Sequence, residues 1–262
     1  MVEISAAAEF LARLRADQRQ VEAIPLELRP ADLNSAYQIQ DALVDRLLDQ
    51  HGGQRIGYKI ACTNPVVQQE LNIAGPLFGQ LLSFSTQHSP ATLRTDDFLV
   101  RVVEVEFAFR MGENVPPTAT PYTRASIAPL IDVALPGIEL VSHRFVDWTQ
   151  VGAPSVAADN AIHAAWIYGA PFAGWRALDL AQHAVSLTVN GQLVRQGQGA
   201  QVLGHPLNVV AWLANELPKH GKQLQVGDYI TTGVATEVYL AAAGDRMLAD
   251  FGVIGRVELL FT

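Results

Sequence analysis

The sequence predicts an α+β protein in which helices gather near the N-terminus and mostly antiparallel strands form the remainder. Three observations carry this prediction. Apolar residues recur at helical spacing within the first fifty positions, and short apolar runs bounded by Gly, Pro or Asp follow them. In addition, Asn190-Gly191 marks a tight turn between two strand-like runs. No internal repeat or low-complexity segment interrupts this pattern.

Composition and charge narrow the possible functions. A chain of 262 residues can bury a substantial core, and its length fits one large domain or one domain with a helical appendage. With 49% hydrophobic and 17% charged residues, the chain does not have the composition of a disordered protein. The net charge is -8 and no run of Lys or Arg occurs, so an electrostatic footprint for nucleic acid is missing.

Targeting and redox signals favour the cytoplasm. Charged residues interrupt the apolar positions of residues 1–19, so this stretch is predicted to be neither a signal peptide nor a spanning helix. No other segment reaches spanning length without a charge or a helix breaker. The single cysteine, Cys62, cannot form an intrachain disulfide, which suits a reducing compartment. We therefore expect a soluble cytoplasmic protein with no membrane partner.

Two amphipathic helices are predicted at the start of the chain. The apolar stripe of the first helix consists of Ile4, Ala7, Ala8, Phe10, Leu11 and Leu14. The second helix is expected over residues 31–49, directly after Pro30, because proline favours a helix start. Residues 1–52 are accordingly predicted to form a helical region packed on a core of residues 53–262, as one compact unit.

The rest of the chain is predicted to be mainly strands. Short apolar or alternating runs predict strands over 55–63, 100–110, 137–145, 227–233, 237–241 and 253–261, with a hairpin over 184–197. Caps, prolines and helical spacing predict helices over 63–71, 125–133 and 206–217.

Three glutamates lie inside apolar strands. Side chains alternate along a strand, so Glu104 and Glu106 share one face, and Glu139 lies in the next predicted strand. A hard divalent cation such as Mg²⁺ prefers carboxylate oxygens together with waters that a substrate can displace. The three glutamates suit one side of such a site. The same spacing also fits a strand with one solvated face, so spacing alone leaves both interpretations open.

Lys59 is the second candidate for chemistry. Its strand neighbours Tyr58 and Ile60 face the opposite way. A lysine near a metal or in an apolar pocket can have a pKa low enough for proton transfer. Alternatively, its stem lies along the sheet and its ammonium group reaches water.

Other catalytic motifs are absent or incomplete. In GQGAQVLG, Val202 stands where a dinucleotide fingerprint requires a glycine. Walker-type loops, G-x-S-x-G elbows and H-E-x-x-H spacings do not occur, which disfavours nucleotide binding, α/β-hydrolase chemistry and zinc. Cys62 lacks a nucleophile signature and is better explained as a small core residue.

Several motifs together resemble a known family. GYKIACTNPVVQQELNIAGPLFGQL, VVEVEFAF, LPGIELVSHRFVDW, VAADNA, GQGAQVLGHPLNVVAWLANEL and VGDYITTG follow one another in the chain. Their order and approximate spacing resemble those of the 2-oxopent-4-enoate hydratase and 4-oxalocrotonate decarboxylase family, within the fumarylacetoacetate hydrolase superfamily. The resemblance extends from about residue 52 to the end of the chain.

The resemblance implies a fold and a set of site residues. It implies a mixed β-roll core preceded by helices, and a Mg²⁺ or Mn²⁺ ion held by Glu104, Glu106 and Glu139. The G-x-K motif of the family matches Lys59, which implies a role in proton transfer. The later TG segment matches Thr232 and Gly233, which implies contact with the substrate carboxylate.

Two departures from the hydratase pattern affect the implied chemistry. Hydratases usually carry Asp in a PDFG segment, and here Leu77 occupies the acidic position. If that aspartate helps to activate water, Leu77 favours the decarboxylase branch. The segment EIVDSR of relatives is ELVSHR here, and strand parity places His143 on the Glu139 face. His143 is therefore a candidate for substrate contact, with a structural role as the alternative.

The resemblance implies a divalent-metal lyase that hydrates 2-hydroxypenta-2,4-dienoate-type 2-oxo acids in aromatic catabolism. The alternative is decarboxylation of 4-oxalocrotonate-type diacids, because loss of CO₂ leaves the same kind of enolate for a cation to stabilise. A non-catalytic binding protein that keeps the fold is a further alternative. An acylpyruvate hydrolase is disfavoured because no histidine precedes His51 in the helical region. Similar chains usually assemble, so we expect a homo-oligomer.

Overall fold

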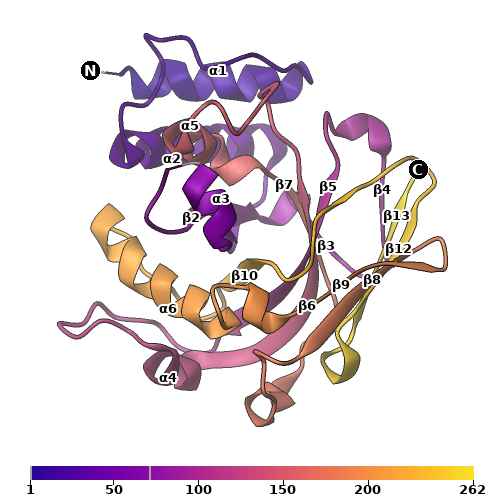
Figure 1. The fold of residues 1–262 in the computed structure, drawn as a ribbon. Coiled ribbons are helices and arrows are strands. Elements are labelled where there is room, and N and C mark those ends of the chain that lie inside the picture. Colours follow the sequence, from indigo (N-terminus) through magenta and orange to yellow (C-terminus); the bar gives the residue numbers. More distant parts are fainter. Residues whose placement is uncertain (1, 71) are drawn as a thin grey trace.

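The N-terminal helices stack on one side of the protein. A computed structural model describes residues 2–70 and 72–262, and Figure 1 shows its course. Helix α1 (Ile4–Ala16) packs on α2 (Leu33–His51), and α2 packs on α5 (Ala153–Ala158). Helix α2 begins at a capping box, in which the Asp32 side chain accepts from the Ser35 N–H at 2.8 Å. Both predicted N-terminal helices are therefore confirmed.

A large mixed sheet forms the centre of the fold. Its strands run in the order β2 (Leu77–Leu82), β1 (Arg55–Ala61), β10 (Tyr229–Val234), β5 (Val102–Met111), β6 (Ile131–Val141), β7 (His163–Tyr168) and β3 (Thr86–His88), and β11 (Tyr239–Leu240) also pairs with β5. The pairs β1–β10 and β3–β7 are parallel, and the other pairs are antiparallel.

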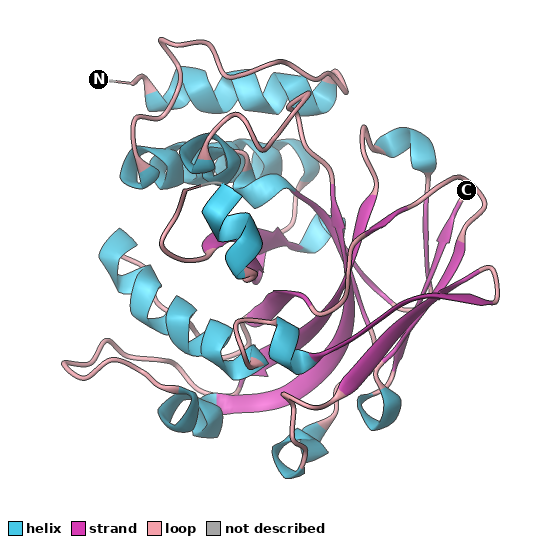
Figure 2. Ribbon diagram, viewed as in Figure 1, coloured by secondary structure: helices cyan, strands magenta, loops and turns pink. Residues whose placement is uncertain are grey.

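A second sheet and several short helices complete the structure. The second sheet has the order β4 (Ala91–Leu93), β13 (Arg256–Phe261), β12 (Arg246–Asp250), β8 (Ala184–Val189) and β9 (Gln192–Gln198). Figure 2 shows long, strongly curved strands, and α6 (Pro206–Glu216) lies within their curve. Two short helices, α3 (Pro65–Glu70) and α4 (Arg124–Ile127), lie in connections between strands. The architecture confirms the predicted α+β class with a curled mixed β core.

The predicted hairpin and the C-terminal strands are confirmed, but the segment around Pro136 differs. The predicted helix over 125–133 ends early, and strand β6 already begins at Ile131. Pro136 lies inside β6 rather than before it. The backbone of Pro136 faces the end of β7, which ends at Tyr168. The N–H of the next residue, Gly169, donates to the Pro136 carbonyl at 2.9 Å. The missing N–H of Pro136 thus falls where the pairing with β7 ends, opposite Gly169, and Pro136 keeps its acceptor bond.

Strands buried on both faces were not predicted. Strand β2, LFGQLL, is buried at every position, and β7, HAAWIY, is nearly so. Such strands show no alternation of apolar and polar residues, so periodicity does not reveal them. The division at residue 52 stays a prediction, and Met1 and Leu71 lie outside the described residues. In the described part of the chain, every helix lacks the length and apolar character needed to span a bilayer.

Candidate metal centre

The pairing of β5 with β6 brings the three predicted carboxylates together. Glu104 lies directly opposite Glu139 in the antiparallel register, and Glu106 lies opposite Gly137. Residues that face each other across two strands have Cβ atoms about 4.5–5.5 Å apart, so their side chains converge on one face. One carboxylate oxygen from each glutamate lies within 4.8 Å of the others. Strand register therefore builds the cluster from distant parts of the sequence.

Two oxygens of this cluster are buried and have no hydrogen-bond partner. Glu106 and Glu139 are both fully buried, and Glu106 Oε1 and Glu139 Oε2 have no partner among the described residues. By contrast, Glu106 Oε2 accepts a hydrogen bond from the Gly233 N–H at 3.1 Å. A buried carboxylate oxygen without a partner is energetically costly. These two atoms therefore indicate a ligand that supplies positive charge.

The donor set fits a hard divalent cation. Only carboxylate oxygens converge here, and such oxygens suit Mg²⁺ or Mn²⁺. Oxygens on opposite sides of one Mg²⁺ lie about 4.2 Å apart, twice the Mg–O distance of about 2.1 Å. The spread of up to 4.8 Å is close to this separation. Three carboxylates and the Lys59 ammonium also sum to a formal charge of -3 + 1 = -2, which a divalent cation balances.

Lys59 reaches the cluster from strand β1. Its Nζ lies 3.1 Å from Glu139 Oε1 and donates a hydrogen bond to the Ala161 carbonyl at 3.1 Å. Burial alone lowers the pKa of Lys59, but Glu139, Glu104 and Glu106 outweigh burial and raise that pKa above its ordinary value. These surroundings therefore favour the protonated form of Lys59, and the lowered pKa that a nearby metal could cause stays a prediction.

The carboxylates differ in their electrostatic surroundings. Burial raises the pKa of Glu106 well above its ordinary value, and the charges of Glu139 and Glu104 raise it further. Burial also raises the pKa of Glu104, against the opposing effect of Lys59. For Glu139 burial acts in the same direction, but Lys59 and His163 outweigh it and lower the pKa. Glu139 is therefore the best stabilised anion of the three.

His163 is a further residue of the centre that the sequence did not indicate. Its Nδ1 lies 2.8 Å from Glu139 Oε1, and its Nε2 has no partner among the described residues. Burial lowers the pKa of His163 below its ordinary value. A neutral imidazole whose Nδ1 carries the proton can donate to Glu139 and orient that carboxylate. A lone histidine in an apolar stretch gives no spacing signal that identifies this role.

A strained loop presents the carbonyl that holds Lys59. Asn160, Ala161 and Ile162 all have left-handed backbone angles, with φ of 53°, 46° and 55°. This conformation costs non-glycine residues about 1–2 kcal/mol each. The Asn160 side chain braces the loop, because its Oδ1 accepts from the Gln80 N–H at 2.7 Å and its Nδ2 donates to the Gln80 carbonyl at 2.9 Å. Strain held in this way beside the carboxylates is typical of a functional site.

Two arginines, of which Arg144 is buried and Arg15 is partly exposed, also fix this loop. Asp159 is fully buried, and its Oδ1 accepts from Arg15 of α1 at 2.9 Å. Its Oδ2 accepts from the Arg144 Nε at 2.7 Å. Arg15 also donates to the backbone carbonyls of Asp159 and His163. The N-terminal helix thus holds the loop that contacts Lys59 and Glu139.

A cavity of about 600 Å³ opens beside the cluster. Lys59, Glu104, His143 and Gly233 are among the residues that line it. Gly233 has a φ of +87°, and a Cβ there would lie 2.2 Å from Thr63 Oγ1, so only glycine fits. The cavity therefore joins the lysine and one carboxylate of the cluster to a space large enough for a small molecule.

The predicted substrate contacts are distributed unevenly. His143 and Gly233 line the cavity, but the Gly233 N–H is already donated to Glu106. Thr232 is fully buried, its hydroxyl donates to the Phe107 carbonyl at 2.9 Å, and it is not among the lining residues. Leu77 is fully buried in the hydrophobic core and also lies outside the lining. Of these four residues, the structure brings two to the cavity.

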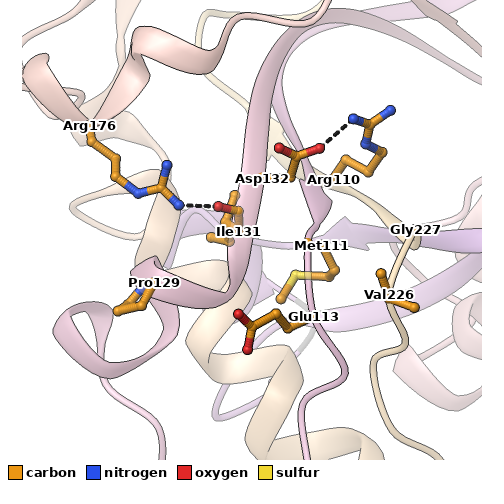
Figure 3. Close-up of a pocket in the computed structure, with 10 residues that line it drawn as sticks. Arg110, Met111, Glu113, Pro129, Ile131, Asp132, Arg176, Val226 and Gly227 are labelled. Carbon is orange, nitrogen blue, oxygen red and sulfur yellow. Dashed lines mark hydrogen bonds and ion pairs between the residues drawn. The ribbon is translucent and has the colours of Figure 1, made fainter.

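A second hollow lies elsewhere and lacks these features. Figure 3 shows its charged side chains, among them Arg110, Asp132 and Arg176. Arg110 forms an ion pair with Asp132, and Arg176 donates to the Ile131 carbonyl. These charges already have partners and are partly exposed, so this hollow has no cluster comparable to the three glutamates.

The curled mixed sheet with N-terminal helices defines the fumarylacetoacetate hydrolase fold. Residues 78–260 match the family described as Fumarylacetoacetate (FAA) hydrolase C-terminal. The chain is 31% identical to 2-keto-4-pentenoate hydratase of Burkholderia vietnamiensis, over the whole of both chains. It is also 31% identical to 2-oxo-hept-4-ene-1,7-dioate hydratase of Escherichia coli, over 97% of this chain and 96% of the relative. The chain therefore belongs to the fumarylacetoacetate hydrolase C-terminal family.

A solved structure shares the fold. It is 4-oxalocrotonate decarboxylase from Pseudomonas putida G7, complexed with magnesium and adipate. The two align with a TM-score of 0.91 and 24% identity, over 99% of this chain and 97% of that chain.

Proposed function

We propose that this protein is a divalent-metal-dependent lyase that adds water to 2-hydroxypenta-2,4-dienoate-type acids in aromatic catabolism. One observation carries the proposal: two buried carboxylate oxygens without partners lie in a cluster of three glutamates, beside Lys59 and a cavity. Family membership supports it, because curated relatives include hydratases of a keto-pentenoate and a keto-heptenedioate.

Glu104, Glu106 and Glu139 would hold the Mg²⁺ or Mn²⁺ ion. When bound, the cation would stabilise the negative charge that develops at the C2 oxygen of a 2-oxo acid as its enolate forms. The 2-oxo acid offers its C1 carboxylate and its C2 oxygen on adjacent carbons, so the substrate would lie with that end toward the glutamates. Its remaining carbons would then extend into the cavity.

Lys59 would move the proton that interconverts enol and ketone. Its Nζ lies 3.1 Å from Glu139 and the residue lines the cavity, so Lys59 is placed to exchange a proton with a substrate bound there. The Ala161 carbonyl and Glu139 hold its Nζ, each at 3.1 Å, and this fixes the direction in which the proton leaves. His163 positions Glu139 and does not itself line the cavity.

Decarboxylation of a 4-oxalocrotonate-type diacid is the second candidate. Leu77 favours it, since an aliphatic residue stands where hydratases of the resembling family usually carry Asp. The structure buries Leu77 fully, and this position cannot contribute a carboxylate to water activation. A non-catalytic binding protein is the third candidate, and the buried orphan oxygens beside a cavity count against it.

A turnover assay combined with metal titration tests the proposal. We expect the purified chain to consume 2-hydroxypenta-2,4-dienoate with Mg²⁺ and to stop when a chelator is added. Glu106→Gln should abolish both the calorimetric Mg²⁺ signal and turnover, whereas Glu258→Gln, an exposed strand glutamate, should change neither. Turnover only of 4-oxalocrotonate would select the decarboxylase. Equal heats of Mg²⁺ binding for Glu106→Gln and Glu258→Gln would contradict the assignment of the metal centre to the three glutamates.

Assembly and location extend the proposal. We propose a homo-oligomer in the cytoplasm, supported by the resemblance and by the single cysteine, Cys62. Light scattering coupled to size-exclusion chromatography measures the oligomeric state, and a monomer at micromolar concentration would contradict the proposed homo-oligomer.

A further inference from the structure

We propose that the cavity selects acids whose distal end carries no charge. This inference rests on the proposed function, which places the C1 carboxylate and the C2 oxygen of the substrate at the three glutamates. The tail must then enter the remainder of the 600 Å³ space. Family membership leaves the charge of the tail open, because one relative is named for a monoacid and another for a 1,7-dioate.

The walls available to the tail are largely apolar. Side chains from separate parts of the chain supply them, namely Val67, Val102, Trp148, Val156, Ile162 and Val238. These residues come from α3, β5, α5, the strained loop and two connecting segments. A tail of CH₂ or CH₃ groups gains free energy on such a surface in proportion to the apolar area that it buries.

The lining offers no free cation to a second carboxylate. Among the lining residues that the structure describes, Lys59 alone carries a positive charge, and Glu139 and the Ala161 carbonyl already hold its Nζ. Neutral polar side chains such as Gln201 and Thr236 also line the cavity, but uncharged donors offset the lost water of a carboxylate less well than a cation does.

The histidine in the wall is also unsuitable for an anion. His143 Nδ1 lies 2.6 Å from the Phe145 carbonyl. A carbonyl can only accept, so Nδ1 carries the hydrogen, and a neutral ring presents a lone pair at Nε2. Burial lowers the pKa of His143, which favours this neutral form. An Nε2 lone pair repels a carboxylate.

The rim carries an ion pair. Glu237 lines the cavity with a side chain that is 86% exposed, and its Oε2 lies 3.8 Å from the Arg195 Nε. Its neighbour Arg195 lies outside the lining, where its Nε donates to the Val238 carbonyl at 3.0 Å. The guanidinium also lies 5.9 Å from the Tyr239 ring centroid. Because Glu237 and the Val238 carbonyl already engage Arg195, this arginine is not a free cation for a distal carboxylate.

Paired keto acids test this inference by binding, independently of turnover. 2-Oxohexanoate and 2-oxohexanedioate differ in having CH₃ or COO⁻ at C6. Calorimetry with the full chain and saturating Mg²⁺ should show about 100-fold or tighter binding of the monoacid. The reason is that removing water from an unpaired carboxylate costs free energy. Equal or tighter binding of the diacid overturns the inference. If neither binds, the placement of the chelating end is wrong, and the inference falls with it.

Turnover then separates this inference from the proposed function. We expect kcat/KM for 2-hydroxypenta-2,4-dienoate to exceed that for 2-oxohept-4-ene-1,7-dioate by about 100-fold or more. Preference for the monoacid in binding, with no turnover of any acid, would contradict the function and support the selectivity. 4-Oxalocrotonate is a diacid, and its distal carboxylate would have to lie on the apolar wall. Efficient decarboxylation of 4-oxalocrotonate would therefore overturn the selectivity.

A charge introduced at the rim provides a gain-of-function test. Val238 lines the cavity and is 44% exposed, so Val238→Arg should leave the fold intact. It should improve binding of 2-oxohexanedioate about tenfold or more and weaken binding of 2-oxohexanoate, because a charge replaces part of the apolar wall. Val253→Arg is the matched control, since Val253 is 65% exposed and lies outside the cavity. An equal gain in both variants would contradict the assigned position of the tail.

Discussion

Two clusters of buried charge meet at residues 159–163, and they differ in how their polar atoms are satisfied. In the first, Asp159 lies between Arg15 and Arg144, and both of its carboxylate oxygens accept hydrogen bonds. In the second, Glu104, Glu106 and Glu139 lie beside Lys59, and two buried oxygens have no partner in the described part of the chain. In the first cluster one carboxylate is paired with two guanidinium groups, although Arg144 Nη2, 2.6 Å from Asp159 Oδ2, makes no hydrogen bond among the described residues. In the second cluster three carboxylates share one ammonium group.

The contrast between the two clusters distinguishes buried charges that stabilise the fold from buried charges that are available for chemistry. Taking charges out of water is costly, and complete pairing offsets that cost. The arginine cluster links α1 to the loop before β7 and so ties the N-terminal helix to the sheet. The glutamate cluster concentrates like charges on one strand pair. Such an arrangement persists in a folded protein when a cation completes it.

The largest effect is expected from Glu139→Gln. This residue belongs to the carboxylate cluster and also accepts from Lys59 and His163, so one substitution disturbs every part of the centre. We expect kcat to fall by about 1000-fold or more, since a metal contributes several kcal/mol at the transition state. Steady-state kinetics with Mg²⁺ measures this. The exposed Glu258→Gln serves as control, and near-normal kcat in Glu139→Gln would refute the role.

Asp159→Asn should mainly affect stability. It leaves Arg15 and Arg144 close together without a counterion, and Arg144 is only 4% exposed. We expect the free energy of unfolding to fall by about 3–5 kcal/mol, the usual effect of breaking a buried pair. Urea denaturation measures the change. Asp250→Asn is the control, because its pair with Arg256 is largely exposed and should contribute less than about 1 kcal/mol. Equal losses in both variants would contradict the structural role of the Asp159 cluster.

Mg²⁺ should stabilise the protein through the glutamate cluster alone. An ion that binds only the folded state adds about 2.7 kcal/mol at a concentration 100 times its Kd. We therefore expect Tm to rise with Mg²⁺ and to return when a chelator is added, in the wild type and in Val253→Arg. The shift should vanish in Glu139→Gln. A Mg²⁺-dependent rise that survives Glu139→Gln would place the ion elsewhere.

His163 should have a smaller effect, because it acts through Glu139. Removing the group that orients a metal ligand typically weakens metal affinity by about 10–100-fold. We expect His163→Phe to weaken Mg²⁺ affinity by this amount, because the variant loses the donor to Glu139 Oε1. His163→Asn keeps an N–H donor and should recover much of the affinity. Calorimetric Mg²⁺ titration distinguishes them, and equal affinities for the two variants would show that His163 only fills space.

The sequence revealed the carboxylates but not the groups that support them. Glu104 and Glu106 alternate within an apolar strand, and strand parity places them together. Their meeting with Glu139 depends on the β5–β6 register, which the motif order of a known family implied and local patterns did not. His163, Ala161 and Asp159 act through tertiary contacts and a left-handed backbone, and no spacing rule identifies such positions. Strands β2 and β7 were missed because burial on both faces removes alternation.

The smallest effect is expected on the stability of the metal-free Glu106→Gln variant, and its sign distinguishes the two clusters. Glu106→Gln replaces a carboxylate whose pKa burial and the neighbouring Glu139 and Glu104 raise well above its ordinary value. A raised pKa means that the ionised group destabilises the metal-free fold at neutral pH, and this penalty fades as the pH falls through that pKa. The amide removes the charge, and its oxygen still accepts from the Gly233 N–H. We expect the metal-free variant to be more stable than the wild type by about 1 kcal/mol at pH 7, with a smaller gain at pH 5. Urea denaturation in chelator measures both values. The same change from acid to amide is expected to lower stability at Asp159. If Glu106→Gln also lowered the free energy of unfolding, the proposed difference between the two clusters would be contradicted.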